Sequence, residues 1–233
     1  MLQNYLKITW RNLRRNRVYT FLNVLGLSLG IACGLMVFWF IRFHTTHDAF
    51  HANIDRIYQV TTEFHFDGTS YSKGVPPPTW KAVRDETSAL SATICIEGYE
   101  KLMALIDANG RPVKKFKEGP GAKLAYTTPE YFKIFDYQWQ VGAPSSLKKP
   151  NTVVISEGMA KKYFGDDDPI GRIIKLENQL NLEVTGIVNS PPENTDLPYE
   201  FFVSFATLEN NRDFSYGGHD LDTWSGVNSG TYC

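Results

Sequence analysis

The pattern of apolar and polar positions is dominated by one long apolar segment, residues 18–41, which contains no charged side chain. At 1.5 Å of rise per residue, a helix over this segment crosses a hydrocarbon core of about 30 Å, for which roughly 20 apolar residues suffice. A cleaved signal peptide is the competing interpretation, but its apolar region has about 7–15 residues and ends at small side chains. This segment is longer and ends in bulky side chains, so we predict a transmembrane helix.

Basic residues precede the segment, and no acidic residue occurs before Asp48. Because Lys and Arg in short loops stay in the cytoplasm, the N-terminus is expected inside and the chain after residue 42 outside. The residues that carry this topology signal are Lys7, Arg11, Arg14, Arg15 and Arg17. Apolar side chains among residues 2–17 recur near helical spacing, which is typical of an amphipathic helix at the membrane surface. A helix continuous with the span is the alternative.

Within the span, Gly26, Gly30 and Gly34 recur every fourth residue and therefore share one helical face. Small residues at this spacing let another helix backbone approach closely. We predict a helix-packing face here. Residues 44–233 contain no second apolar run of comparable length, so the chain itself offers no partner span.

The rest of the chain shows short strand and helix patterns. Residues 54–66 alternate between apolar and polar side chains and are predicted to form one half-buried strand. Asn109–Gly110 predicts a type I′ hairpin turn, whereas Ser156 and Gly165 are expected to start and end a helix over residues 157–164. Further strands are expected at 92–97, 101–106, 112–117, 122–126, 152–155, 172–177, 182–188 and 200–205, and helices at 79–90 and 130–135. This irregular order predicts an α+β fold: one N-terminal transmembrane helix followed by a mixed-sheet domain.

The net charge of −1 conceals an asymmetry, because residues 1–47 hold 6 of the 24 Lys and Arg side chains and no acid. The remaining residues carry 18 basic and 25 acidic side chains. The basic block therefore signals topology, and no aromatic-rich basic surface supports nucleic-acid binding. Cys33, Cys95 and Cys233 are too few for a disulfide framework, and a single Cys95–Cys233 bond stays open.

Candidate chemistry is sparse. His44, His47, Asp48 and His51 share a face if the span continues as a helix through residues 42–53, which suggests either a zinc site or an ordinary polar helix end. The acidic run at residues 166–168 lacks the spaced ligands of a calcium loop and indicates a solvated turn. No phosphate loop, nucleophile elbow or H-E-x-x-H motif is present. We expect no enzyme activity, no bound metal and no cofactor.

Several segments resemble the permeases of MacB/FtsX-type ABC transporters. Residues 10–17 and the following Leu22-Asn23 and Gly26-Leu27 are similar to the start of these permeases. Residues 47–60 are similar to the junction after the first span in the Bacteroidetes branch, where Arg usually replaces Ala49 and Gln59. Residues 156–176 and 183–188 are similar to the MacB-like periplasmic core domain. The matching residues include Ala160, Tyr163, Phe164, Gly165, Asp168, Pro169, Gly171 and Gly186.

The resemblance implies a cytoplasmic segment at 1–17, a transmembrane helix at 18–41 and a periplasmic core domain at 42–233, incomplete at its C-terminal end. The chain is then the N-terminal part of a longer permease in a bacterial inner membrane. It implies that a separate cytoplasmic ATPase binds ATP and that the permease relays motion across the membrane to the periplasmic domain. Such a relay needs a stiff lever, and we expect the span, continuing into residues 42–53 without a Gly or Pro, to form it. Further implied partners are a second permease copy, a periplasmic adaptor and an outer-membrane channel that expel drugs, peptides or lipoproteins. The alternative is an FtsX-like adaptor that regulates a cell-wall hydrolase without transport.

Overall fold

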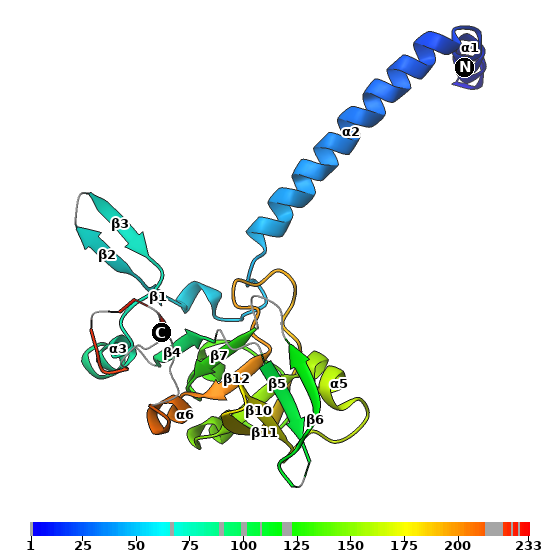
Figure 1. The fold of residues 1–233 in the computed structure, drawn as a ribbon. Helices are drawn as coiled ribbons and strands as arrows, with labels where there is room; N and C mark the ends of the chain where they lie inside the picture. The colour runs from blue at the N-terminus through cyan, green and yellow to red at the C-terminus, as the bar shows by residue number, and fades with distance from the viewer. Residues whose placement is uncertain are drawn as a thin grey trace. The chain divides into compact units, whose positions relative to one another are not determined.

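The chain divides into two compact units, Met1–His47 and Asp48–Cys233, which we call the helical unit and the sheet domain. The structure is a computed structural model, shown as a ribbon in Figure 1. It describes residues 2–65, 68–88, 91–98, 102–107, 109–117, 123–212, 221–224, 226–227 and 229–233.

The helical unit contains α1 (Leu2–Arg15) and α2 (Arg17–Thr45), which are separate helices because the chain breaks at Asn16. Across the break, the Thr20 hydroxyl donates to the Leu13 carbonyl at 3.0 Å. Within the described residues, α2 is the one helix long and apolar enough to cross a membrane. None of its side chains is buried and all but that of Thr20 are exposed, which is the surface expected of a helix that lies in lipid.

The expected helical extension through residue 53 is wrong, because α2 ends at Thr45. The Thr45 and Thr46 hydroxyls donate to the carbonyls of Ile41 and Arg42, at 3.0 and 2.8 Å, and thereby satisfy carbonyls of the last turn. Asp48 then adopts a positive φ of 55°, which an α-helix does not accommodate. Turns therefore replace the continuous stiff helix predicted over residues 42–53.

The sheet domain is built on one mixed sheet with the order β1-β13-β4-β7-β12-β9-β11-β10-β5-β6, in which β8 also pairs with β11. Figure 1 shows this sheet with part of its strands labelled, among them β4, β7 and β12. The pairs β7–β12 and β9–β11 are parallel, and the other neighbours are antiparallel. The strands are β1 (Gln59–Val60), β4 (Thr93–Glu97), β5 (Leu102–Ile106), β6 (Pro112–Lys117), β7 (Leu124–Thr127), β8 (Trp139–Val141), β9 (Thr152–Ser156), β10 (Ile173–Leu176), β11 (Leu180–Val188), β12 (Phe201–Ser204) and β13 (Gly230–Tyr232).

Both faces of the central strands are buried. Along β9, Val153 and Ile155 belong to one apolar cluster and Val154 to the other, because successive side chains of a strand point to opposite faces. The covering helices are α3 (Thr79–Glu86), α4 (Tyr131–Ile134), α5 (Glu157–Phe164) and α6 (Phe205–Asn210), with the 3₁₀ helices η1 (Ile54–Arg56) and η2 (Pro144–Lys148). The predicted α+β fold with a mixed sheet is confirmed. Because both faces of the sheet are covered, every residue of β9 and β12 is buried.

The single strand predicted over residues 54–66 is wrong. Its first residues form η1, Gln59 and Val60 pair with β13, and β2 (Thr62–His65) pairs with β3 (Thr69–Ser72) in a separate hairpin. The alternating pattern survives in β2, where every second side chain is half-buried. The alternating segment therefore contributes strands to two sheets: β1 to the large sheet and β2 to the hairpin. Thr61, which belongs to neither strand, connects them.

The turn predicted at Asn109–Gly110 is one residue out of place. The Gly110 N–H donates to the Asp107 carbonyl at 3.0 Å, so the turn runs from Asp107 to Gly110. Gly110, the last residue of this turn, has a left-handed φ of 76°. The helix signals are confirmed: the Ser156 hydroxyl accepts from the Met159 N–H at 3.2 Å, and Gly165 ends α5 with a φ of 66°.

Replacing Gly186 by Ala is expected to destabilise the sheet domain by about 1–3 kcal/mol, the usual cost of overpacking. A Cβ at this buried position of β11 would lie 2.7 Å from Cζ3 of Trp139 and 3.2 Å from the Val141 carbonyl. Chemical denaturation of the full chain in detergent, followed by near-UV circular dichroism, measures the change.

The Trp139→Leu background supplies the control, because it removes the nearest atom. There the cost of Gly186→Ala should fall clearly. An equal cost in both backgrounds would show that Trp139 is not the obstacle.

Candidate functional site

The first residues of the sheet domain, 48–52, are tied to distant parts of its chain, and we call them the anchor segment. The Asp48 N–H donates to the Asn194 carbonyl at 3.1 Å. The Asp48 carboxylate accepts a short hydrogen bond from the Thr195 hydroxyl and a longer one, 3.3 Å, from the Asp196 N–H. Charge-assisted bonds of this kind are stronger than neutral ones, so Asp48 fixes the anchor segment to the loop before β12.

His51 forms the second attachment and is 3% exposed. Its Nδ1 accepts from the Asp136 N–H at 3.0 Å, and the Ala52 N–H donates to Asp136 Oδ2 at 2.7 Å. The imidazole also packs against Phe135 and Tyr137, with ring centroids 5.2 and 6.3 Å away. The anchor segment is thereby joined to the apolar cluster that contains Phe135 and packs against Tyr137.

The bond from Asp136 requires a neutral His51, because a backbone N–H needs a lone pair on Nδ1. Burial lowers the pKa of His51, while the carboxylates of Asp48 and Asp136 act in the opposite direction. Desolvation is the larger effect, so His51 is uncharged at neutral pH and is held by hydrogen bonding and packing.

The predicted grouping of histidines does not form, because the helix that would align them ends at Thr45. His44 and His47 stack on one another in the helical unit with centroids 5.6 Å apart, whereas His51 belongs to the sheet domain and uses Nδ1 for Asp136. Among the described residues, no group of three or more His, Cys, Asp or Glu side chains is placed to hold a metal.

The motif residues of α5 are structural. Ala160 and Phe164 pack against the first apolar cluster. Tyr163 is buried, its ring stacks on Phe116 at 3.9 Å, and its hydroxyl donates to Met103 Sδ at 3.3 Å. These contacts join α5 to β5 and β6 across the sheet face.

The remaining motif residues shape the turns around α5 and β10. Asp168 Oδ1 accepts from the Ile170 N–H at 3.0 Å, and the Pro169 carbonyl accepts from the Arg172 N–H at 3.1 Å. Gly171 has a φ of 76° and its N–H donates to the Val184 carbonyl at 2.8 Å. The motif therefore specifies a fold element.

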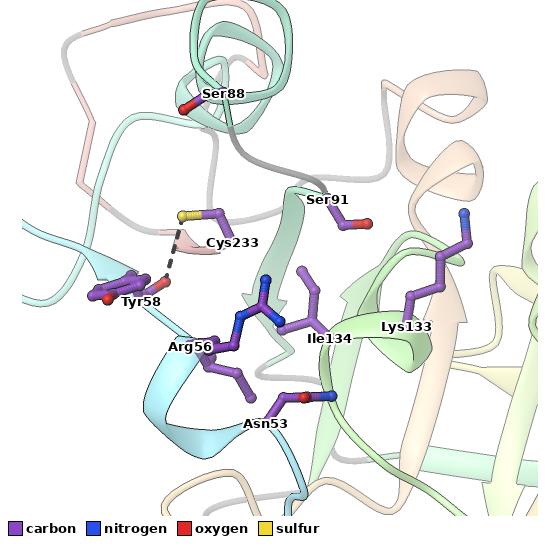
Figure 2. A pocket seen from close by; sticks show the side chains of 9 residues that line it. Asn53, Arg56, Tyr58, Ser88, Ser91, Lys133, Ile134 and Cys233 are labelled. Atoms are coloured by element: carbon purple, nitrogen blue, oxygen red, sulfur yellow. Dashed lines mark hydrogen bonds between the residues drawn. The ribbon is translucent and has the colours of Figure 1, made fainter.

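A pocket of about 370 Å³ lies next to the anchor segment (Figure 2). Sequence reasoning missed this pocket, because its walls come from four separate stretches of the chain and no motif spans them. It is lined by Asn53, Arg56, Ile57, Tyr58, Ser88, Ser91, Lys133, Ile134 and Cys233.

The possible Cys95–Cys233 bond is not formed, and both thiols are free. Cys95 lies opposite Gly230 in the β4–β13 register, and Cys233 comes three residues later in the chain, just after β13 ends. Cys95 is completely buried, and burial raises the pKa of its thiol to about 12. A protonated, enclosed thiol of this kind is unreactive.

The fold and the helix define a class of protein: an α+β domain attached to one membrane-type helix. Residues 20–227 match the model of the MacB-like periplasmic core domain, and the chain belongs to this family of ABC transporter permease domains. No curated protein sequence matches the chain.

Several solved structures are similar to this chain at low sequence identity. A domain of a protein described as a permease, from Porphyromonas gingivalis, has a TM-score of 0.61 and 18% identity over 78% of this chain and 73% of its own. The periplasmic region of MacB from Actinobacillus actinomycetemcomitans has a TM-score of 0.48 and 15% identity over 68% and 64%. The extracellular domain of the noncanonic ABC-type transporter YknZ from Gram-positive bacteria has a TM-score of 0.42 and 14% identity over 76% and 80%.

Stability of the sheet domain should fall as the pH drops from 7.5 to 5.5. The folded-state pKa of His51 is lowered, so the unfolded chain binds more protons below about pH 6.5. The contribution of His51 is complete above that pH and is lost as the pH falls toward the folded-state pKa. Thermal unfolding of the full chain at several pH values measures it.

His51→Gln keeps an acceptor for Asp136 but does not titrate, so its unfolding temperature should depend less on pH. His65→Gln is the matched control, because the His65 side chain is 71% exposed. If His51→Gln and the unmodified chain follow the same pH curve, His51 is not the titrating group.

The three glycines of α2 leave an open face, since a Cβ at Gly26, Gly30 or Gly34 would meet no atom within 4 Å. Replacing all three by Leu should weaken association of the complete permease with its partner helices, because close backbone approach is lost. Co-purification of differently tagged copies in detergent measures this effect.

Ser28→Leu is the control, because residue 28 lies about 200° around the helix from residue 26 and adds bulk on the opposite side. Loss of association in the control but not in the glycine variant would contradict the assignment of the face.

Proposed function

We propose that this protein is the permease subunit of a MacB-like ABC transporter and relays ATPase-driven motion across the inner membrane to a periplasmic domain. The observation that carries the proposal is the anchor segment. Only residues 46 and 47 separate the end of α2 from Asp48, which is hydrogen-bonded to the loop before β12. A connection of two residues is too short to absorb a large displacement of the helix end, so such a displacement would be passed on to the sheet domain.

Asp48 and His51 suit this relay because each is hydrogen-bonded to a different part of the sheet domain. Asp48 binds the loop at residues 194–196, and His51 binds Asp136 at the end of α4. A displacement of the anchor segment would thus act both on the loop before β12 and on Phe135 and Tyr137, which pack against His51. Packed elements move between discrete arrangements rather than deforming continuously, which is what a transmitted signal requires.

In this proposal the N-terminus lies in the cytoplasm, as Lys7, Arg11, Arg14, Arg15 and Arg17 indicate, and the sheet domain lies in the periplasm. ATP binds to a separate ATPase, and this subunit needs no cofactor. A second permease copy or homologue packs against the glycine face. A periplasmic adaptor and an outer-membrane channel would complete a pathway for drugs, peptides or lipoproteins.

The proposal is tested with the full-length protein in a complex with a cytoplasmic MacB-type ABC ATPase, reconstituted in nanodiscs. Hydrogen–deuterium exchange is compared between nucleotide-free and ATP-bound complexes. We expect exchange to change in peptides covering residues 48–52 and 194–204 on ATP binding. The double variant Asp48→Ala/His51→Ala should lose this change while it keeps the ATPase bound.

Asp166→Ala/His65→Ala is the matched control, because it removes the same residue types from exposed positions and should respond normally. An ATP response that is absent in the unmodified complex would refute the relay. An FtsX-like adaptor would share the relay, so cargo distinguishes the two: ATP-dependent export of a compound supports the transporter, and activation of a cell-wall hydrolase without export supports the adaptor.

A further inference from the structure

We propose that the pocket beside the anchor segment binds an amphiphile that carries a phosphate head group. The pocket is formed by η1 and the residues around it, by α4, by Ser88 and Ser91, and by Cys233 after β13 (Figure 2). The argument rests on its charge, its unused hydrogen-bond donors and its apolar wall.

Among the described residues that line the pocket, Arg56 and Lys133 are cations and none has a carboxylate side chain. Lys133 is partly neutralised, since its Nζ lies 3.9 Å from Glu130 Oε1. Within the described part of the chain, the Arg56 guanidinium forms no hydrogen bond or ion pair. Figure 2 shows it extending from η1 into the centre of the group of lining side chains. A planar guanidinium in this position suits the oxygens of a phosphate.

Neutral donors also line the pocket. Asn53, Ser88 and Ser91 supply an amide and two hydroxyls, and none of these side chains has a hydrogen-bond partner among the described residues. A phosphate offers three strong acceptor oxygens, so the cations and the neutral donors can be used together. A carboxylate, with two oxygens, would use fewer of them.

The pocket is also larger and more apolar than a phosphate alone requires. Ile57 and the buried Ile134 provide an aliphatic wall, and the ring of Tyr58 lies at the side. Its volume falls in the range of sites for small organic ligands, about 300–1,000 Å³. The apolar wall accommodates the hydrocarbon attached to the head group.

The site does not depend on the proposed relay, because binding requires only the sheet domain residues. It would nevertheless bear on that relay, since Asn53 follows the last residue of the anchor segment directly. A bound ligand that orders η1 would stabilise the arrangement of the segment next to it.

The test is a calorimetric titration of the full-length protein in a neutral maltoside detergent. Dihexanoyl phosphatidic acid is the probe, dihexanoyl phosphatidylcholine tests the need for a net negative head group, and inorganic phosphate tests the head group alone. Titrations into protein-free micelles subtract partitioning. We expect saturable binding of phosphatidic acid that weakens with added salt, and binding at least about tenfold weaker for the other two probes.

Arg56→Gln should weaken phosphatidic acid binding about tenfold or more, the loss expected for one charge-assisted bond. Arg111→Gln is the matched control, because Arg111 is exposed beside β6 at the opposite edge of the sheet, and its affinity should stay within about twofold. If Arg56→Gln fails to fold, Lys133→Gln and Arg56→Lys take its place, with smaller losses expected.

Three results would overturn the proposal. The first is an affinity for phosphatidic acid unchanged in Arg56→Gln or its substitutes. The second is equal binding of the zwitterionic lipid, which would mean that the apolar wall alone selects the ligand. The third is equal binding of inorganic phosphate, which would show that a free anion, not an amphiphile, is the ligand.

Discussion

The hydrogen bonds that Asp48 and His51 make determine where the sheet domain begins. Both residues belong to the anchor segment, but their partners at residues 194–196 and at Asp136 are far from them in the chain. The positive φ of Asp48 is tolerated because its carboxylate and its N–H are both used there. Without these bonds, the turns after Thr45 would not be attached to the sheet domain. The chain that leads into β1, which pairs with β13, would then lose its fixed position.

The central strands impose a second constraint. They carry apolar side chains on both faces, so helices must cover both faces of the sheet. Helix α5 meets one face through Tyr163, and α4 meets the other through Tyr131. Burial raises the pKa of Tyr131 far above its usual value, so this hydroxyl stays protonated in an apolar cluster that His51 also contacts through Phe135. The anchor is therefore continuous with the packing of the second face.

Local signals in the sequence were sufficient for much of the fold. Ser156 and Gly165 bound α5 because capping depends on neighbouring residues, and apolar β9 was visible because it is covered twice. The break of residues 54–66 into two sheets was missed, since alternation reports burial and not the pairing partner. The helix end at Thr45 was missed because it depends on hydroxyl bonds and on Asp48, whose partners lie some 147 residues away.

The anchor and the pocket were hidden from sequence reasoning for the same physical reason, and their adjacency has a thermodynamic consequence. Residues 48–52 hold the domain by hydrogen bonds, and Asn53 and Arg56 immediately afterwards line a pocket with unused donors. A ligand that binds only the ordered arrangement of η1 would stabilise that arrangement, and by reciprocity a displaced anchor would lower ligand affinity. Because the segment that transmits motion is continuous with a wall of the pocket, ligand binding and displacement of the anchor segment would affect each other without a separate regulatory element.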